Sequence, residues 1–136
     1  MITPVDTNVL LDVFADSPFG PASREALRRA LREGSLMACD VVWAEVSAHF
    51  AGIRAAEEAL RTARVDFAPI DPEVALAAAS KWRRHRGRGG ARDRIVSDFL
   101  IGAHAWMRAD RFLTRDRGFY RTYFERLQLI DPSSPR

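Results

Sequence analysis

Four acidic residues, spread along almost the whole chain, are the side chains best suited to chemistry: Asp6, Glu45, Asp98 and Asp116. Asp6 directly follows a short apolar stretch and is itself followed by a hydroxyl, Thr7, and an amide, Asn8. Asp116 comes just after a second apolar stretch. Carboxylates are hard oxygen ligands that suit Mg²⁺ or Mn²⁺. If the fold brings these acids together, the sequence predicts a divalent-cation site.

Each acid also has a simpler interpretation. Glu45 falls on a predicted helical face among small and apolar residues, where it is either exposed or paired with an arginine. Asp98 lies at the border of an apolar helical face and could be an ordinary surface residue. Asp116 could cap a short helical turn, and Asp93 is expected to cap the helix that it begins. Asp12, one turn beyond the first acid, is expected to be solvated.

Short apolar strands alternate with amphipathic helices along the chain. The predicted strands are 2–5, 35–38, 65–70, 111–114 and 127–130. The predicted helices are 7–15, 21–33, 40–50, 53–64, 72–87 and 93–108. This alternation predicts an α/β three-layer sandwich, with a central parallel sheet of four to five short strands flanked by helices. Ligands of such sheets bind beyond the carboxyl ends of the strands, which is where Asp6 and Asp116 fall.

Local signals add detail to this outline. Asp71 is predicted to cap the helix 72–87, and Asp40 to cap the helix that follows it. Gly102, one turn beyond Asp98, is expected to allow the close approach of another element.

Length and composition fit one globular domain. The 136 residues are long enough to bury a core, and 47% are hydrophobic while 29% are charged. We expect the domain to span residues 1–130, followed by a disordered tail at 131–136. Cys39 is the only cysteine, which fits a reducing compartment such as the cytoplasm. We expect neither a signal peptide nor a membrane span.

The acids stand in motifs that resemble those of a known family. The stretches VDTNVLLDVF, WAEV, SDFLIGAHA and FLTRDRGFY are similar to the ordered acidic motifs of PIN-domain nucleases, in particular the VapC-type toxins of bacterial type II toxin–antitoxin systems. This resemblance runs nearly end to end. It implies that Mg²⁺ or Mn²⁺ is held for catalysis by Asp6, Glu45, Asp98 and Asp116. It also implies that these ligands are oriented through hydrogen bonds from Thr7, Asn8 and Thr114.

The resemblance further implies an activity and partners. The activity is metal-dependent hydrolysis of phosphodiester bonds in RNA, with no protein nucleophile. The partners are an RNA substrate, a cognate antitoxin protein and a second copy of the chain in a homodimer. No phosphate-binding loop of the Walker type occurs in the sequence.

A basic stretch, residues 81–94, precedes the motif that contains Asp98. Cations at the end of a helix complement its dipole, which accounts for the arginines up to residue 86. It does not account for those beyond the glycine-rich turn. We therefore predict contacts with the RNA backbone from Arg83, Arg84, Arg88 and Arg92. The tryptophans and histidines are interpreted as core or surface residues: Trp43, Trp82, Trp106, His49, His85 and His104.

Three other classes share some of these features. A phosphoacceptor or signalling receiver domain would need a lysine after a late strand, whereas the only lysine, Lys81, lies late in a predicted helix. A phosphatase of the DxDx(T/V) type would need an acid at position 8, which is Asn8. A non-catalytic RNA-binding module would not need the set of acids, because acids repel phosphate unless a cation intervenes.

Overall fold

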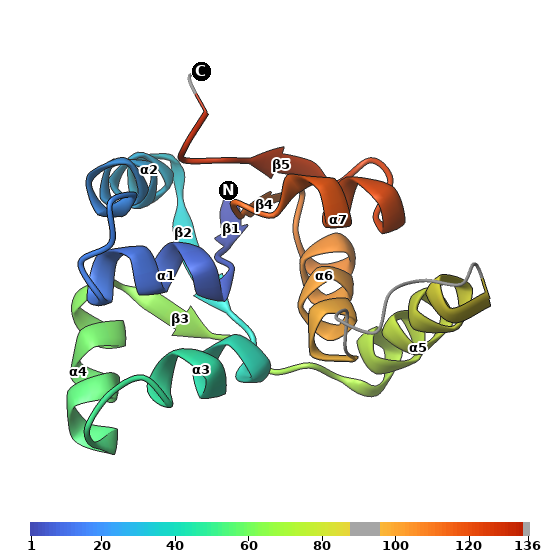
Figure 1. Ribbon diagram of the computed structural model, residues 1–136, viewed down its shortest axis with the longest axis horizontal. Coiled ribbons are helices and arrows are strands. Elements are labelled where there is room, and N and C mark those ends of the chain that lie inside the picture. Colours follow the sequence, from blue (N-terminus) through green and yellow to red (C-terminus); the bar gives the residue numbers. More distant parts are fainter. Residues whose placement is uncertain (88–95, 135–136) are drawn as a thin grey trace.

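The computed structural model describes residues 1–87 and 96–134 as five short strands and seven helices within those ranges (Figure 1). The strands are β1 (Ile2–Pro4), β2 (Ser35–Ala38), β3 (Val65–Phe67), β4 (Arg111–Leu113) and β5 (Gln128–Ile130). The helices are α1 (Thr7–Phe14), α2 (Gly20–Glu33), α3 (Asp40–Ser47), α4 (Ile53–Thr62), α5 (Pro72–Gly87), α6 (Val96–Arg108) and α7 (Arg117–Tyr123).

All strand pairs are parallel, and they form one spatial order. β1 pairs with β2, β2 with β3, and β4 with β5. A single bridge between Val5 and Leu113 joins the two groups, and the main-chain N–H of Asp6 donates to the carbonyl oxygen of Leu113 at 2.9 Å. The order across the molecule is therefore β3-β2-β1-β4-β5. Because β1 and β4 are parallel neighbours, the residues that follow them emerge side by side.

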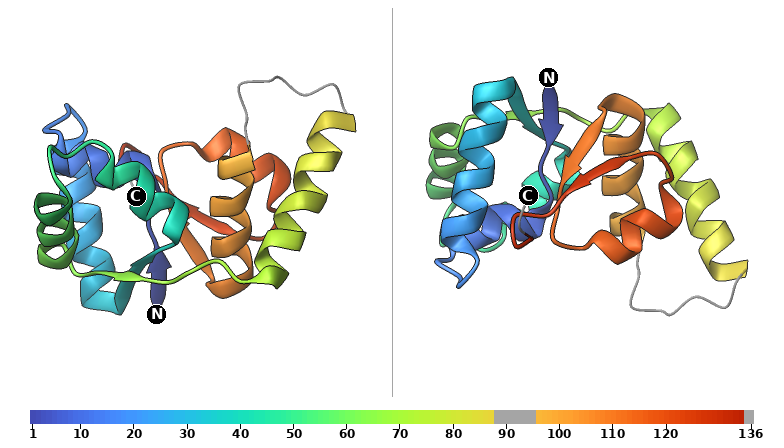
Figure 2. Two further views of the ribbon diagram at one scale, coloured as in Figure 1. Left: turned by 90° about the horizontal axis from the view of Figure 1, so that it is seen from below. Right: turned by 90° about the horizontal axis from the view of Figure 1, so that it is seen from above.

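The helices divide between the two ends of the molecule's longest axis. Helices α1–α4 gather at one end and α5–α7 at the other, with the strands running between them (Figures 1 and 2). α1 packs against α2 and α3, whereas α6 packs against α5, β4 and α3. The predicted α/β sandwich with a parallel sheet of four to five strands is confirmed.

The core explains why these segments fold as they do. Val9 and Leu10 of α1 are completely buried, as are Val42 and Val46 of α3 at the helical spacing of four residues. Gly102 of α6 lies so close to the ring of Phe124 that a Cβ atom there would stand 2.4 Å from it. The predicted close approach at Gly102 is confirmed.

Several boundaries differ from the sequence-based expectation. Asp40 does not cap α3, because Cys39 occupies the N-cap position and the Asp40 carboxylate accepts a hydrogen bond from the Ile70 main chain at 3.3 Å. Asp71 does cap α5, since its carboxylate accepts from the N–H of Val74 at 3.0 Å. The strand expected over 65–70 ends at Phe67, before a proline that has no N–H to donate.

The C-terminal region contains the largest difference. The sequence suggested at most a short turn after Asp116, but α7 is a seven-residue helix that buries Phe119, Tyr120 and Tyr123. The domain boundary at residue 130 stays a prediction, although Asp131 still forms an ion pair with Arg117 at 3.1 Å. Within the two described ranges, no helix is both long and apolar enough to cross a membrane.

Candidate active site

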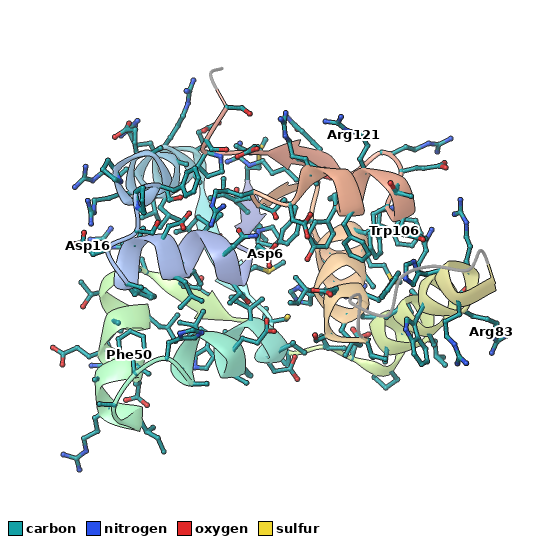
Figure 3. All side chains as sticks on the ribbon, in the orientation of Figure 1. Asp6, Asp16, Phe50, Arg83, Trp106 and Arg121 are labelled. Carbon is teal, nitrogen blue, oxygen red and sulfur yellow. The ribbon has the colours of Figure 1, made fainter. Side chains whose placement is uncertain are left out.

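Asp6 is the central acid of the site and lies between α1 and α6 (Figure 3). It is the N-cap residue of α1, and the residue is 5% exposed. Its Oδ1 accepts from the N–H of Thr7 at 2.8 Å, and its Oδ2 accepts from Thr114 Oγ1 at 2.7 Å and from Asn8 Nδ2 at 3.3 Å. Among the described residues, no lysine, arginine or histidine forms an ion pair with it.

The environment of Asp6 disfavours its charge. Burial raises the pKa of Asp6 from 3.8 to about 6. Hydrogen bonds from Thr114 and Thr7 lower the pKa, while the negative charges of Asp116 and Glu45 raise it further. Asp116 and Glu45 therefore both lie within electrostatic reach of Asp6.

Glu45 comes to the site from α3 through a contact with α1. The Thr7 hydroxyl donates to Oε1 of Glu45 at 2.7 Å, and the Glu45 side chain is half-buried. The interpretations of Glu45 as a fully exposed residue or as the partner of an arginine do not hold among the described residues. Thr7 thus uses its main chain to bind one acid and its side chain to bind another.

Thr114 links the two acids that follow neighbouring strands. Its hydroxyl donates to Asp6 and accepts from the N–H of Asp116 at 3.0 Å. Asp116 stands at the N-cap position of α7, yet its side chain makes no capping hydrogen bond. Capping therefore does not explain the Asp116 carboxylate, which is half-buried beside Asp6.

Asp98 completes the set from the first turn of α6, where its side chain is half-buried. It approaches the others around Tyr120, a residue that sequence reasoning did not select. Burial raises the pKa of Tyr120 well above its usual range, and the charges of Asp6, Asp98 and Asp116 raise it further. The Tyr120 hydroxyl therefore stays protonated beside Asp6.

Asp12 contradicts the expectation that it is solvated. It is 3% exposed and accepts two hydrogen bonds from Arg115, at 2.7 and 2.9 Å, and one each from Ser17 and Ser23. Burial alone would raise the pKa of Asp12, but hydrogen bonds from Arg115 and the two serines hold it below its usual value. Sequence reasoning missed these partners because the serines lie in a loop and a helix with no signal of their own.

Two of the four predicted RNA-binding arginines, Arg83 and Arg84, belong to α5. Arg83 and Arg84 are exposed near the end of α5, and Figure 3 shows Arg83 at the far end of the molecule from Asp6. Arg88, Arg92 and the predicted cap Asp93 lie outside the described residues. The Arg84 guanidinium lies 6.0 Å from the ring centre of Tyr123, and the role of both arginines in RNA binding stays a prediction.

The histidines and tryptophans are packing or surface residues, as the sequence predicted. His85 and His104 are buried and His49 is exposed. Trp43 packs edge-on against Phe67, whereas Trp106 is 38% exposed and donates to the carbonyl oxygen of Glu125. His85 lies 2.6 Å from the Tyr123 hydroxyl through its Nδ1, which places it in the aromatic packing between α5 and α7.

The chemistry of the donors fits a hydrated divalent cation, although the acids form no closed cage. Among residues 1–87 and 96–134, no three Asp, Glu, His or Cys side chains converge tightly enough to make a ready metal site. Mg²⁺, however, commonly binds through one or two carboxylates and keeps several waters. Asp6 and Asp116, joined through Thr114, are the pair best placed for that mode of binding.

The family model described as the PIN domain matches residues 4–125, nearly the whole chain. The chain belongs to the PIN-domain family. The match spans all four acids of this PIN domain, from Asp6 to Asp116. Among curated protein sequences, none is similar enough to this chain to count as a match.

Solved structures share the fold of this PIN domain over most of its length. VapBC2 from Rickettsia felis, bound to a DNA fragment from its promoter, has a TM-score of 0.76 at 17% identity, covering 96% of this chain and 98% of that one. A toxin–antitoxin complex from Klebsiella pneumoniae has a TM-score of 0.66 at 17% identity, covering 98% and 99%. The sarcin-ricin loop cleaving toxin VapC20 from Mycobacterium tuberculosis has a TM-score of 0.64 at 16% identity, covering 92% and 98%.

Proposed function

We propose that this PIN domain is a divalent-metal-dependent endoribonuclease and the toxin of a toxin–antitoxin pair. The observation that carries the proposal is the buried Asp6 carboxylate, which has hydrogen-bond donors and neighbouring acids but no cation among the described residues. A buried charge is costly unless it is paired or bound to a metal. A cation bound at the site during function would offset the cost of burying the Asp6 charge.

The four acids and their donors have separate tasks in this proposal. Asp6, Glu45, Asp98 and Asp116 hold Mg²⁺ or Mn²⁺, directly or through water. When bound, the cation supplies an activated water and neutralises charge on the phosphate and the leaving oxygen. Thr114 and Asn8 keep the Asp6 carboxylate in one orientation, and Thr7 does the same for Glu45.

The protein's own charges then define how RNA meets the site. The acids repel phosphate in the absence of a cation, so RNA binding and metal binding are expected to be coupled. The exposed Arg83 and Arg84 of α5 would hold the RNA backbone at a distance from the reacting phosphate.

The biological role rests on the proteins of similar fold. The Klebsiella complex is a toxin–antitoxin complex, and the Mycobacterium protein is a sarcin-ricin loop cleaving toxin. By this likeness we propose that the chain pairs with an antitoxin protein and forms a homodimer. Expression of the chain alone should stop growth of a bacterial host, and co-expression of its antitoxin should restore it. Normal growth despite abundant, RNA-cleaving protein would reject the toxin role and keep the nuclease.

Cleavage of RNA by purified protein tests the enzymatic part of the proposal. Wild-type protein should cleave bulk cellular RNA with Mg²⁺ or Mn²⁺ and lose this activity in excess EDTA. Asp98→Asn should abolish cleavage, whereas Asp110→Asn should not. Asp110 is the matched control because it is exposed just beyond the other end of α6. Equal cleavage by wild type and Asp98→Asn, purified in the same way, would reject the assignment.

A further inference from the structure

The unexplained feature nearest to the site is a second buried carboxylate on α1. Asp12 is 3% exposed and accepts four hydrogen bonds from three side chains. Two of them come from one guanidinium, because Arg115 Nε donates to Oδ2 at 2.7 Å and Arg115 Nη2 donates to Oδ1 at 2.9 Å. Such a two-point contact fixes the direction as well as the position of an arginine.

Arg115 lies in the connection between β4 and α7, between two residues of the site. Its predecessor Thr114 donates to Asp6, and its successor is Asp116. Its own N–H donates to Asn8 Oδ1 at 3.2 Å, while Asn8 Nδ2 donates to Asp6. The main chain and the side chain of Arg115 are thus bound to Asn8 and Asp12, four residues apart on the same face of α1.

The other side of the guanidinium is also covered. The ring of Phe19 lies 4.2 Å from the Arg115 guanidinium carbon, and Ser17 and Ser23 anchor the carboxylate that Arg115 binds. The loop between α1 and α2 therefore supports the same contact. The Arg115 side chain is 27% exposed, whereas the Asp12 side chain is almost completely buried.

We propose that Asp12 and Arg115 are a positioning pair for the candidate active site. The pair ties the segment Thr114–Asp116 to α1, and in this way it sets the distance between the Asp6 and Asp116 carboxylates. Neither residue is a metal ligand or a reacting group in this role. The inference rests on the proposed function, because it concerns the same acids.

Asp12 provides the cleaner test, since a residue that is 3% exposed is too enclosed to bind RNA itself, and its contact with the segment Thr114–Asp116 is through Arg115. The matched control is Glu33→Gln. Glu33 pairs at 3.3 Å with the buried Arg111, at the start of β4 and away from the acids. Each variant removes one ion pair of an arginine in the segment 111–115, either that of Arg115 or that of Arg111. Both variants should therefore lower the melting temperature.

The measurements are RNA cleavage over a range of RNA concentrations and Mn²⁺ binding to the RNA-free protein by electron paramagnetic resonance. Asp12→Asn should lower kcat and Mn²⁺ affinity by about 10- to 100-fold, as loss of a group that orients metal ligands commonly does. KM should stay the same. Glu33→Gln should leave kcat, KM and Mn²⁺ affinity within about twofold of wild type, within the scatter expected of a change outside the site.

Arg115→Lys is the second variant, and it decides the question if Asp12→Asn does not fold. Lysine keeps the charge but cannot make the two-point contact, so kcat and Mn²⁺ affinity should fall as above. A rise in KM alone would instead make Arg115 an RNA-binding residue and overturn the proposal. So would wild-type kcat and Mn²⁺ affinity in these variants. A wild-type protein that neither binds Mn²⁺ nor cleaves RNA would overturn the proposed function as well.

Discussion

The two ends of α1 each bury a carboxylate, and the two are treated in opposite ways. Asp6, at the N-terminal end of α1, is 5% exposed. Asp12, in the last turn of α1, is 3% exposed. Asp12 has a guanidinium and two serine hydroxyls, whereas Asp6 has, among the residues that the structure describes, neutral donors and neighbouring acids but no cation. The pKa of Asp12 is accordingly lowered, and that of Asp6 is raised to about 6.

This contrast separates a structural acid from a functional one. A buried ion pair with satisfied hydrogen bonds is complete within the protein, and breaking it destabilises the fold. A buried carboxylate with acids around it is incomplete, because like charges repel at short range. Among the described residues nothing supplies a positive charge to Asp6, and the proposed divalent cation would supply one.

Removing the charge at the Asp6 end should have the largest effect on activity. We expect Asp6→Asn to lower RNA cleavage by more than about 100-fold, beyond the usual effect of a residue that only orients a ligand. The fold should persist, because asparagine can still accept from Thr114. Initial cleavage rates, with circular dichroism to confirm folding, check this. Cleavage by Asp6→Asn at the wild-type rate would show that Asp6 is not needed for activity.

The same two positions should have opposite effects on stability. In EDTA at neutral pH, Asp12→Asn should lower the free energy of unfolding by about 2–4 kcal/mol, somewhat less than a fully buried pair because Arg115 keeps partial exposure. Asp6→Asn should raise it by about 1–3 kcal/mol, since it relieves a buried, uncompensated charge. Urea denaturation of both variants measures the signs. A loss of stability in both would mean that Asp6 is also a structural acid.

The contrast also predicts a pH dependence for the metal-free protein. Raising the pKa of Asp6 from 3.8 to about 6 corresponds to about 3 kcal/mol. The favourable protonation of folded Asp6 is fully present below pH 4 and is lost as the pH rises through 6. The contribution of Asp12 has the opposite sign, since it is present above pH 4 and lost as the pH falls further.

A subtraction isolates the Asp6 contribution. The stability of wild type minus that of Asp6→Asn, measured by urea denaturation in EDTA, should fall between pH 4 and pH 7 and then level off. If the difference is constant over this range, Asp6 titrates normally in the folded protein.

The smallest effect is expected far from α1. Arg83→Gln with Arg84→Gln should weaken RNA binding and make its salt dependence shallower, by about 0.7 log unit per lost contact with a single strand. The kcat value at saturating RNA should not change. The control is Arg24→Gln with Arg28→Gln on α2, at the opposite end of the molecule (Figure 1). Equal salt slopes in the two double variants would make the α5 arginines an ordinary solvated helix end.

The sequence predicted that Asp6 and Asp116 lie at the same edge of the sheet. Both acids follow apolar stretches, and parallel strands place the residues that follow them at one edge. It also predicted Gly102, where the missing Cβ makes room for Phe124. It could not predict the partner of Asp12. Asp12 and Arg115 are 103 residues apart, and a helical pattern does not distinguish a solvated acid from one that a distant arginine covers. Tyr120 was missed for a similar reason, since an aromatic residue in a short helix looks like ordinary core.

Direct titration of Mn²⁺ into metal-free protein, by isothermal calorimetry without RNA, tests the central claim most directly. Wild type, Asp12→Asn and Asp110→Asn would be compared with Asp6→Asn and Asp98→Asn. The account predicts binding by wild type and Asp110→Asn, weaker binding by Asp12→Asn, and no measurable binding by Asp6→Asn or Asp98→Asn. Binding of equal strength by wild type and Asp6→Asn, or none by wild type, would contradict it.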